Sequence, residues 1–575
     1  MNYLSDINSR QKFLHLYLQT EYWLIATILF LITWYIYGSS YDGFWRLHDG
    51  MHILFALTHS PLQYFFDPAS IAAQSTHLTP WNVFFYDINI SLFGLNPKWH
   101  YTHLILLIWG GCFLTFILLR TQLRSIYSLF GALFFLSGLS TTEAAQQLMT
   151  GHYLTGLIFA QVSIYLYILS LKNNNKALAI LGAFFYLMAT TCKEIYVPFI
   201  IVLPFLPVKD LKERITSFLP YCIAAIIYIA WRFIMIPSFI GGYSPNLDGI
   251  VFIDIVKQFL QIPFILFGSE WYSYIALTGV AYLLMRAIIR HQISLLLVFF
   301  SALALLSPLV PLTIYPGLDS GNNRYFYFLW WGISALLAFL LSKNKTNKEH
   351  FVMVFIGFVL VIAINAHSFS YKNKYLNNFN LYNEQLYQFV LGQQTGYLLI
   401  EGKLVNYWKR VFYAMLKANE ISSGKSLPFV KLVDIHELFE IKKHKSNVNV
   451  FQYSPDSNRV ENINKILPIK LNRLRKKFVK GVNLSLYIHY DGKALKWLFG
   501  PLTEGVYKIF YIDNKGEYKA LNTTHQGSID FSATNRVNFY FSYISPEGWI
   551  AQSPKLFYDP ANSNTFSWKG TSIIP

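Results

Sequence analysis

The chain has 575 residues, of which 54% are hydrophobic, 18% aromatic and only 13% charged, and its mean hydropathy is +0.34. This composition excludes an ordinary soluble domain and is typical of a protein with several membrane-spanning helices. The net charge of +17 is explained by basic loops on one side of a membrane, so it does not indicate nucleic-acid binding.

Apolar runs long enough to cross a hydrocarbon core of about 30 Å recur between Tyr22 and roughly Ala366. We expect the first run to remain as an anchor, because no small-residue cleavage pattern follows it. The short runs near 177 and 195 predict tilted or broken spans. In all, the pattern predicts about eleven transmembrane helices, with cores near 22–38, 102–119, 125–140, 153–171, 177–191, 195–207, 216–236, 272–287, 291–310, 325–342 and 351–366.

Basic residues accumulate in alternate loops, which by the positive-inside rule are cytoplasmic. This alternation predicts a cytoplasmic N-terminus and an extracytoplasmic segment after about residue 367. None of the three cysteines lies in that exported segment, and this usage favours a bacterial inner membrane. The basic residues that set the orientation are Arg120, Arg124, Lys172, Lys176, Lys209, Lys212, Arg214, Arg286, Arg290, Lys343, Lys345 and Lys348.

The composition changes after about residue 370, where the apolar runs shorten. We therefore expect a multi-span all-α membrane domain at 1–370 and an extracytoplasmic helical and linker region at 371–470. A small β-rich domain should follow at 471–575, because NLSLYIHYD, GVYKIFYID, SIDFSA and RVNFYFSYI alternate and are separated by turn residues. A β-sandwich is the natural packing for such strands, so the whole tail is predicted to be α+β.

Asp49 follows the first span in YDGFWRLHDGMH, close to Asp42, His48 and His52. A carboxylate held near aromatic residues is suited to act as a general base toward an alcohol. The alternative is a helix-capping Asp. His48 and His52 are four residues apart, a spacing that can ligate a metal, although interfacial histidines are also ordinary. A divalent metal is therefore conceivable, but no cofactor is assigned.

Further ionisable residues stand at the ends of other spans, on the same predicted external side as Asp49. Ionisable groups at membrane depth indicate function, although those at span ends can also reach water. Each also has a structural alternative: a helix-dipole interaction for Glu143, a surface ion pair for Lys193 and Glu194, and an aromatic-belt anchor for Arg324. These residues are Glu143, which is followed by His152; the adjacent pair Lys193 and Glu194; and Arg324, which precedes Tyr325.

Four sequence elements occur in an order that resembles a known family. They read LFGLNPKWHYTHLILL at 92–107, SGLSTTEAA with Glu143, TTCKEIYVPFIIVLP with Lys193 and Glu194, and RYFYFLWWG with Arg324. The chain resembles the membrane glycosyltransferases of the GT-C fold that use polyprenyl-phosphate sugars. The similar branch includes protein O-mannosyltransferases and membrane mannosyltransferases with tetratricopeptide tails. The family's His-Pro pair before the Glu is missing here.

The resemblance implies an inverting transfer of a sugar from a polyprenyl-phosphate donor to the hydroxyl of a glycan, lipid or protein. It makes Asp49 the base, Lys193 and Arg324 the cations that stabilise the departing phosphate, and Glu143 and Glu194 residues that position the acceptor and the lysine. Asp42, His48, His52, His152 and Tyr325 are further candidate contacts for substrate or metal. The expected partners are the donor, the acceptor and membrane lipids.

Two other classes stay open on the sequence alone. A transporter or flippase of a lipid-linked saccharide would also have many spans, but would more often show internal repeats and charges in mid-span. An O-antigen polymerase or ligase would be expected to carry Arg-rich external loops.

Overall fold

The structure is a computed structural model. It describes residues 2–236 except 47, 75–77 and 207, then 252–267, 301–309 and 324–342 with isolated positions between 274 and 298, and residues 382–575 with short gaps. The chain divides into two compact units. The first contains Met1–Leu381 and Lys417–Gly424, and the second contains Tyr382–Leu416 and Lys425–Pro575.

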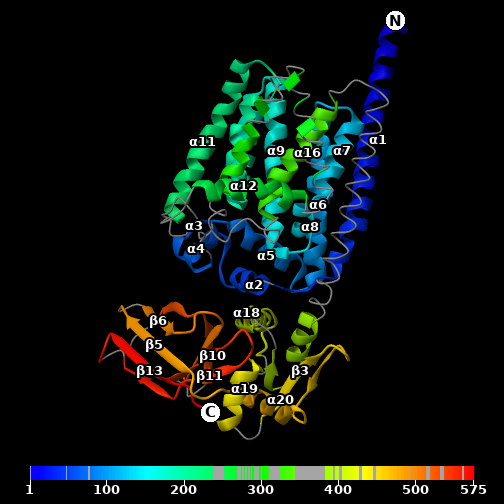
Figure 1. Cartoon of the computed structure of the whole chain (residues 1–575). Coiled ribbons are helices and arrows are strands. Elements are labelled where there is room, and N and C mark those ends of the chain that lie inside the picture. The colour runs from blue at the N-terminus through cyan, green and yellow to red at the C-terminus, as the bar shows by residue number, and fades with distance from the viewer. Residues whose placement is uncertain are drawn as a thin grey trace. The chain divides into compact units, whose positions relative to one another are not determined.

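The first unit is a bundle of helices with a layer of short helices at one end (Figure 1). Asparagine and aspartate side chains start several of the long helices, for example Asn96 before α6 and Asp210 before α11. The long helices are α1 (Asn2–Tyr37), α6 (Pro97–Arg120), α7 (Ser125–Leu136), α9 (Gly151–Asn173), α10 (Lys176–Cys192), α11 (Leu211–Met235), α12 (Phe252–Phe267) and α16 (Tyr327–Ser342). The end layer contains α2 (Asp49–Thr58), α3 (Pro61–Phe66), α4 (Pro68–Gln74) and α5 (Pro80–Phe93).

Five stretches of the described residues are long and apolar enough to span a membrane, and a bent pair of helices makes a sixth. This confirms the prediction of a helical membrane domain. The predicted count of eleven is not confirmed, because the spans expected near 272–287 and 351–366 lie largely or wholly outside the described residues. The described second half of the span expected near 291–310 contains a 3-10 helix, η5 (Leu303–Leu309). The five stretches are Thr20–Asp42, Pro97–Arg120, Leu148–Asn173, Leu211–Met235 and Arg324–Ser342.

The bent pair consists of α7 and α8 (Leu139–Ala145), which meet at an angle of 60°. At the bend, the carbonyl of Phe135 accepts hydrogen bonds from Trp330 Nε1 at 3.1 Å and Thr141 Oγ1 at 2.8 Å. A Cβ at Gly138 would lie 2.0 Å from Trp330 Nε1, so the close approach of Trp330 to the bend requires a glycine at this position. Glu143 therefore lies on the short helix α8 after the bend, and not in a loop between two spans as the sequence predicted.

The apolar segment expected as a short span near 195–207 is not an α-helix. It forms two 3-10 helices, η3 (Glu194–Ile201) and η4 (Leu203–Phe205). Pro198 and Pro204 lack the N–H groups that an α-helix would need there. The predicted broken character of this segment is thus confirmed.

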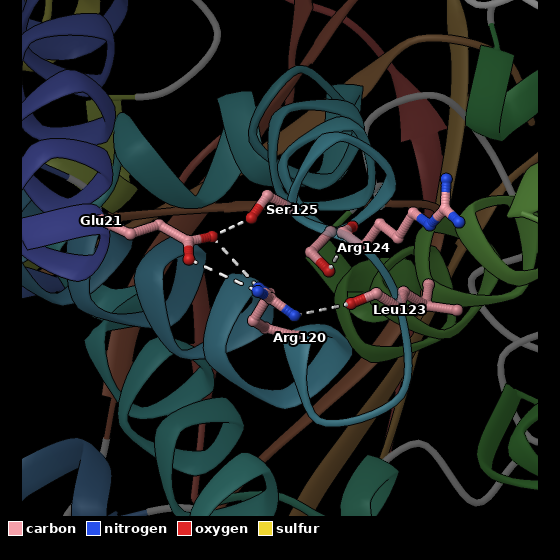
Figure 2. Close-up of polar contacts among 6 residues, drawn as sticks. Glu21, Arg120, Leu123, Arg124 and Ser125 are labelled. Atoms are coloured by element: carbon pink, nitrogen blue, oxygen red, sulfur yellow. Dashed lines mark hydrogen bonds and ion pairs between the residues drawn. The ribbon is translucent and has the colours of Figure 1, made fainter. Parts of the chain in front are cut away.

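The end of the bundle opposite the short helices is held by a polar cluster that joins α1, α6 and α7 (Figure 2). Arg120 Nε lies 3.1 Å from Glu21 Oε1, and Arg120 Nη1 donates to the Leu123 carbonyl at 3.3 Å. Ser125 Oγ also donates to Glu21. At the same end, Lys172 Nζ donates to the Thr121 carbonyl. The basic residues Arg120 and Lys172, in the last turns of α6 and α9, therefore lie together at this end of the bundle.

The second unit begins with a four-stranded mixed sheet in the order β2-β1-β3-β4. None of its four strands was predicted, because each has only four or five residues and the region was expected to be helical and linker sequence. The elements of this part of the chain are β1 (Gly396–Leu399), α18 (Val405–Ser423), whose residues from Lys417 onward are assigned to the first unit, β2 (Val430–Val433), α19 (Ile435–His444), β3 (Val450–Ser454), β4 (Arg459–Asn462) and α20 (Leu467–Arg475).

The last hundred residues form the expected β-sandwich. One sheet has the order β11-β10-β7-β8 with β12 beside β10, and the other has the order β13-β5-β6-β9. Aromatic and aliphatic side chains of both sheets share one core, in which the Phe499 and Phe541 rings are 4.9 Å apart. The strands are β5 (Asn483–Tyr490), β6 (Ala494–Gly500), β7 (Val506–Ile512), β8 (Tyr518–Thr523), β9 (Gln526–Asp530), β10 (Val537–Ile544), β11 (Ile550–Gln552), β12 (Leu556–Tyr558) and β13 (Thr565–Thr571).

A buried ion pair crosses the boundary that was predicted near residue 470. Lys508 on β7 donates to the carboxylate of Asp434, which caps α19, and both side chains are buried. Burial and the Lys508 charge lower the pKa of the neighbouring His436 to about 4. The mixed sheet and the sandwich therefore belong to one unit, in agreement with the division of the chain.

Candidate active site

Asp49 is the first residue of α2 and is only 1% exposed. Its Oδ1 accepts a hydrogen bond from the Tyr86 hydroxyl at 2.5 Å, and its Oδ2 accepts one from the Arg46 backbone N–H at 2.8 Å. Tyr86 lies on α5, which packs against α2. The carboxyl group is thus fixed by two donors, one of which comes from another helix.

Burial is the main influence on the acidity of this carboxyl group. It raises the pKa of Asp49 to about 6, while the hydrogen bonds from Tyr86 and from the Arg46 backbone oppose the rise. Burial and the Asp49 charge raise the pKa of the Tyr86 phenol well above its ordinary value, so this hydroxyl stays protonated and donates. A carboxylate with a pKa near 6 is ionised at neutral pH and is a stronger base than an exposed aspartate.

The two histidines of the first loop lie against this group. The His52 ring stacks on Tyr86 with centroids 5.6 Å apart, and His52 Nε2 lies 3.2 Å from Asn82 Nδ2. Burial and then the neighbouring His48 lower the pKa of His52 to about 3, so its ring is neutral at pH 7. The His48 ring is 6.4 Å from that of His52. Within the described part of the chain, no group of three or more His, Cys, Asp and Glu residues forms a metal-binding cluster.

Lys193 follows the last residue of α10 and is 8% exposed. Its Nζ lies 5.7 Å from the centroid of the Tyr153 ring and 5.8 Å from that of Tyr325. The two rings contact each other edge to face at 6.2 Å. The two aromatic rings stabilise the buried ammonium group of Lys193 through cation–π contacts.

Glu194 is shared between two cations. Its Oε2 lies 3.8 Å from Lys193 Nζ, whereas its Oε1 lies 3.0 Å from Arg232 Nη1. Arg232 is in the last turn of α11. Glu194 is therefore bound more closely to Arg232 than to Lys193, although the sequence predicted only the adjacent pair.

Glu143 and Arg324 form an ion pair that connects α8 to the segment before α16. Arg324 Nη1 donates to Glu143 Oε1 at 3.0 Å, and the Arg324 backbone N–H donates to Oε2 at 3.1 Å. The guanidinium carbon also lies 5.0 Å from the Tyr325 ring centroid. The sequence placed both residues on one side of the membrane but did not predict that they contact each other.

His152, near the start of α9, connects the two groups of residues. It is 4% exposed, and its ring lies within electrostatic range of His52, Lys193 and Arg324. The first-loop group around Asp49 and the cations Lys193, just after α10, and Arg324, just before α16, therefore lie at the same end of the helical unit, where Figure 1 shows α2, α5 and α8. Asp42 differs from the other candidates, because it is 74% exposed and faces Lys98 at 3.9 Å.

Three contributors were not singled out by the sequence. Tyr86 and Tyr153 are two of 40 tyrosines, so nothing in their spacing distinguished them. Arg232 carried a usable signal, because it is a charged residue in the last turn of an apolar span on the same predicted side as Lys193.

Comparisons with known proteins find similar solved structures, which include two crystal structures of ArnT. No family model and no curated protein matches the sequence. A crystal structure of ArnT from Cupriavidus metallidurans bound to undecaprenyl phosphate is 12% identical, with a TM-score of 0.41 over 77% of this chain and 94% of that one. The apo structure of ArnT is 12% identical, with a TM-score of 0.45 over 78% and 95% of the two chains. At these values the similarity assigns neither an activity nor a site residue to this chain.

Proposed function

We propose that this protein is an inverting GT-C glycosyltransferase that moves a sugar from a polyprenyl-phosphate donor to an acceptor hydroxyl. The proposal rests mainly on one observation, the meeting of a buried carboxyl group of raised pKa with the cations Lys193 and Arg324 at one end of the helical unit. An acid–base residue and fixed cations are the two components that such a displacement needs. The motif resemblance agrees with it. One of the ArnT structures contains undecaprenyl phosphate, a lipid of the donor class proposed here.

In the proposed reaction the acceptor oxygen attacks the anomeric carbon of the donor sugar. Asp49 takes the proton of the attacking hydroxyl, and the bond from the anomeric carbon to the phosphate oxygen breaks with its electron pair on that oxygen. The products are the glycosylated acceptor and polyprenyl phosphate. Inversion follows because attack and departure occur on opposite faces of the carbon.

Lys193 and Arg324 would stabilise the negative charge that develops on the departing phosphate. Fixed donors at such a position are worth roughly 3–4 kcal/mol in comparable enzymes. Glu143 and Glu194 would hold the two cations in place, and Tyr153 and Tyr325 would shield them from water. His52 and His152 would line the space between base and cations.

The membrane setting fits a lipid-linked donor, because its phosphate lies at the interface and its tail lies among the spans. We place the site on the extracytoplasmic face of a bacterial inner membrane, with the N-terminus in the cytoplasm. This orientation rests on the basic loops around Arg120 and Lys172, which lie at the opposite end of the unit from Asp49.

The function is tested by supplying membranes with a labelled polyprenyl-phosphate sugar and comparing two Asp→Asn variants. Asp49→Asn should abolish transfer and leave donor binding intact. Asp87→Asn is the matched control, because Asp87 on α5 likewise accepts a hydrogen bond from a tyrosine, Tyr64, at 2.7 Å. Full activity of Asp49→Asn would refute the base assignment. A flippase would move the label across the membrane without breaking its bond to phosphate.

A further inference from the structure

Arg46 is a buried cation that the proposed mechanism does not use. It lies three residues before Asp49 and is 3% exposed. Its backbone N–H donates to Asp49 Oδ2, and its guanidinium carbon lies 5.4 Å from the centroid of the Tyr101 ring. The side chain is therefore fixed beside the Asp49 carboxyl group.

The guanidinium of Arg46 is incompletely paired. Its Nε and Nη1 atoms are buried and have no hydrogen-bond partner among the described residues. A guanidinium is charged at every physiological pH, and a buried charge normally requires a hydrogen-bonded counter-ion. The Tyr101 face and the attraction of the nearby Asp49 carboxylate compensate only part of that cost. The unused donors thus point to an anion that occupies the site during function.

The other buried cations of the site differ in this respect. Arg324 lies 3.0 Å from Glu143, and Lys193 and Arg232 share Glu194. The Asp49 oxygens accept instead from the Tyr86 hydroxyl and the Arg46 backbone, and no ion pair between Asp49 and the Arg46 side chain occurs among the described residues. The positive charge of Arg46 therefore stabilises the Asp49 carboxylate through space, but its side chain makes no close ion pair with that carboxylate among the described residues.

We propose that Arg46 binds an anionic oxygen, of a phosphate or carboxylate group, on the acceptor. This rests on the proposed function, because Asp49 as base must face the attacking hydroxyl. Inversion puts the leaving phosphate on the far side of the reacting carbon, so a cation beside the base lies on the acceptor side. The acceptor is then an anionic molecule, such as a phosphorylated or acidic glycan, and a neutral acceptor is disfavoured.

The test uses the full chain in detergent, saturated with unlabelled undecaprenyl phosphate, and measures binding of radiolabelled inorganic phosphate by equilibrium dialysis. The saturating lipid occupies the donor phosphate position, so bound inorganic phosphate reports a second anion site. Wild type should bind it, and Arg46→Met should bind it at least about tenfold more weakly. Lys98→Met is the control, because Lys98 is 53% exposed and faces Asp42. That variant should bind phosphate as wild type does.

Thermal unfolding of the same proteins supplies a second readout. Met keeps the apolar stem of Arg46 and removes a buried charge that no counter-ion among the described residues hydrogen-bonds, so without phosphate Arg46→Met should be at least as stable as wild type. Phosphate should raise the unfolding temperature of wild type and not that of Arg46→Met. A variant that is much less stable, or that fails to fold, would show that the protein itself satisfies the guanidinium and would overturn the proposal.

Two further outcomes separate this proposal from the proposed function. If Arg46→Met weakens binding of undecaprenyl phosphate itself, Arg46 belongs to the donor site and the acceptor assignment is wrong. If wild type binds no undecaprenyl phosphate, the donor part of the proposed function fails. Binding of inorganic phosphate to wild type and to Arg46→Met can then still be compared without the lipid.

Discussion

Asp49 and Tyr86 form the contact on which the proposed base depends. The phenol donates to a carboxyl group that burial makes weakly acidic, and this hydrogen bond favours the ionised form. The residue therefore balances two opposed effects. Burial increases its basicity, and the hydrogen bond keeps it ionised near neutral pH.

Tyr86→Phe should move the pH dependence of transfer upward. Removing the hydroxyl removes a donor to the Asp49 carboxylate, so the pKa of Asp49 rises above about 6. Because the base must be unprotonated, the rise of the transfer rate with pH should shift to higher pH. Tyr64→Phe, which removes the hydroxyl that donates to Asp87, should leave the profile in place. An unchanged midpoint in Tyr86→Phe would contradict the assigned role.

The buried Asp49 carboxylate should also lower the free energy of unfolding at neutral pH. Its pKa in the folded protein is about 6, above the ordinary value of 3.8, so the folded state holds the proton to higher pH than the unfolded state. The stability of wild type relative to Asp49→Asn should fall between about pH 4 and pH 6, by on the order of 3 kcal/mol, and stay lower above that range. Thermal unfolding of both proteins across pH 4 to 8 measures this. A difference that is independent of pH would show that burial does not perturb the carboxyl group.

At the scale of helices, the site depends on how closely α9 approaches the end of α10. A Cβ at Gly156 would lie 2.3 Å from Tyr196 Cε2 and 2.9 Å from Cys192 Cβ. Cys192 directly precedes Lys193, and the Tyr196 hydroxyl donates to the Tyr153 carbonyl. The glycine thus permits the contact that places the cation beside its aromatic rings.

Gly156→Ala should destabilise the protein by about 1–3 kcal/mol, the usual cost of overpacking, and should weaken donor binding because Lys193 is displaced. Gly110→Ala on α6 is the matched control, because its Cβ would meet only Ile158 Cδ1 at 3.7 Å. Thermal unfolding and binding of a polyprenyl phosphate test both variants. Equal behaviour of the two would mean that the packing of α9 on α10 does not set the site.

Much of this arrangement could be predicted from the sequence. The alternation of basic loops placed Asp49, Glu143, Lys193 and Arg324 on one side, and in the structure they lie at one end of the helical unit. The individual partners could not be predicted, since a span's sequence does not specify the rotation of its helix about its own axis. For that reason the contacts of Glu143 with Arg324 and of Glu194 with Arg232 were missed.

At the scale of the whole molecule, patterns with a strong local signal were read more successfully than short elements. The alternating aromatic strands from Asn483 onward predicted the β-sandwich, whereas the four-residue strands of the mixed sheet gave too little periodicity. The apolar segment after Lys193 was recognisable as irregular from its two prolines and its length.

The orientation of the chain is tested with reporter fusions. A reporter that is active only outside the cytoplasm should be active when fused after residue 400 and inactive when fused near Lys345, since the basic loops are expected to be cytoplasmic. The reverse pattern would place Asp49 and the cations on the cytoplasmic face and contradict the proposed location of the reaction.

The central claim is that cations from separate helices form one site for a lipid phosphate. Equilibrium binding of undecaprenyl phosphate to the full chain, compared between Lys193→Gln and Lys172→Gln, tests it most directly, because these two lysines lie at opposite ends of the bundle. Lys193→Gln should weaken binding roughly tenfold to a hundredfold, as expected for the loss of a charged hydrogen-bond donor, and Lys172→Gln should bind as wild type does. Equal binding by both variants, or a loss confined to Lys172→Gln, would contradict the account.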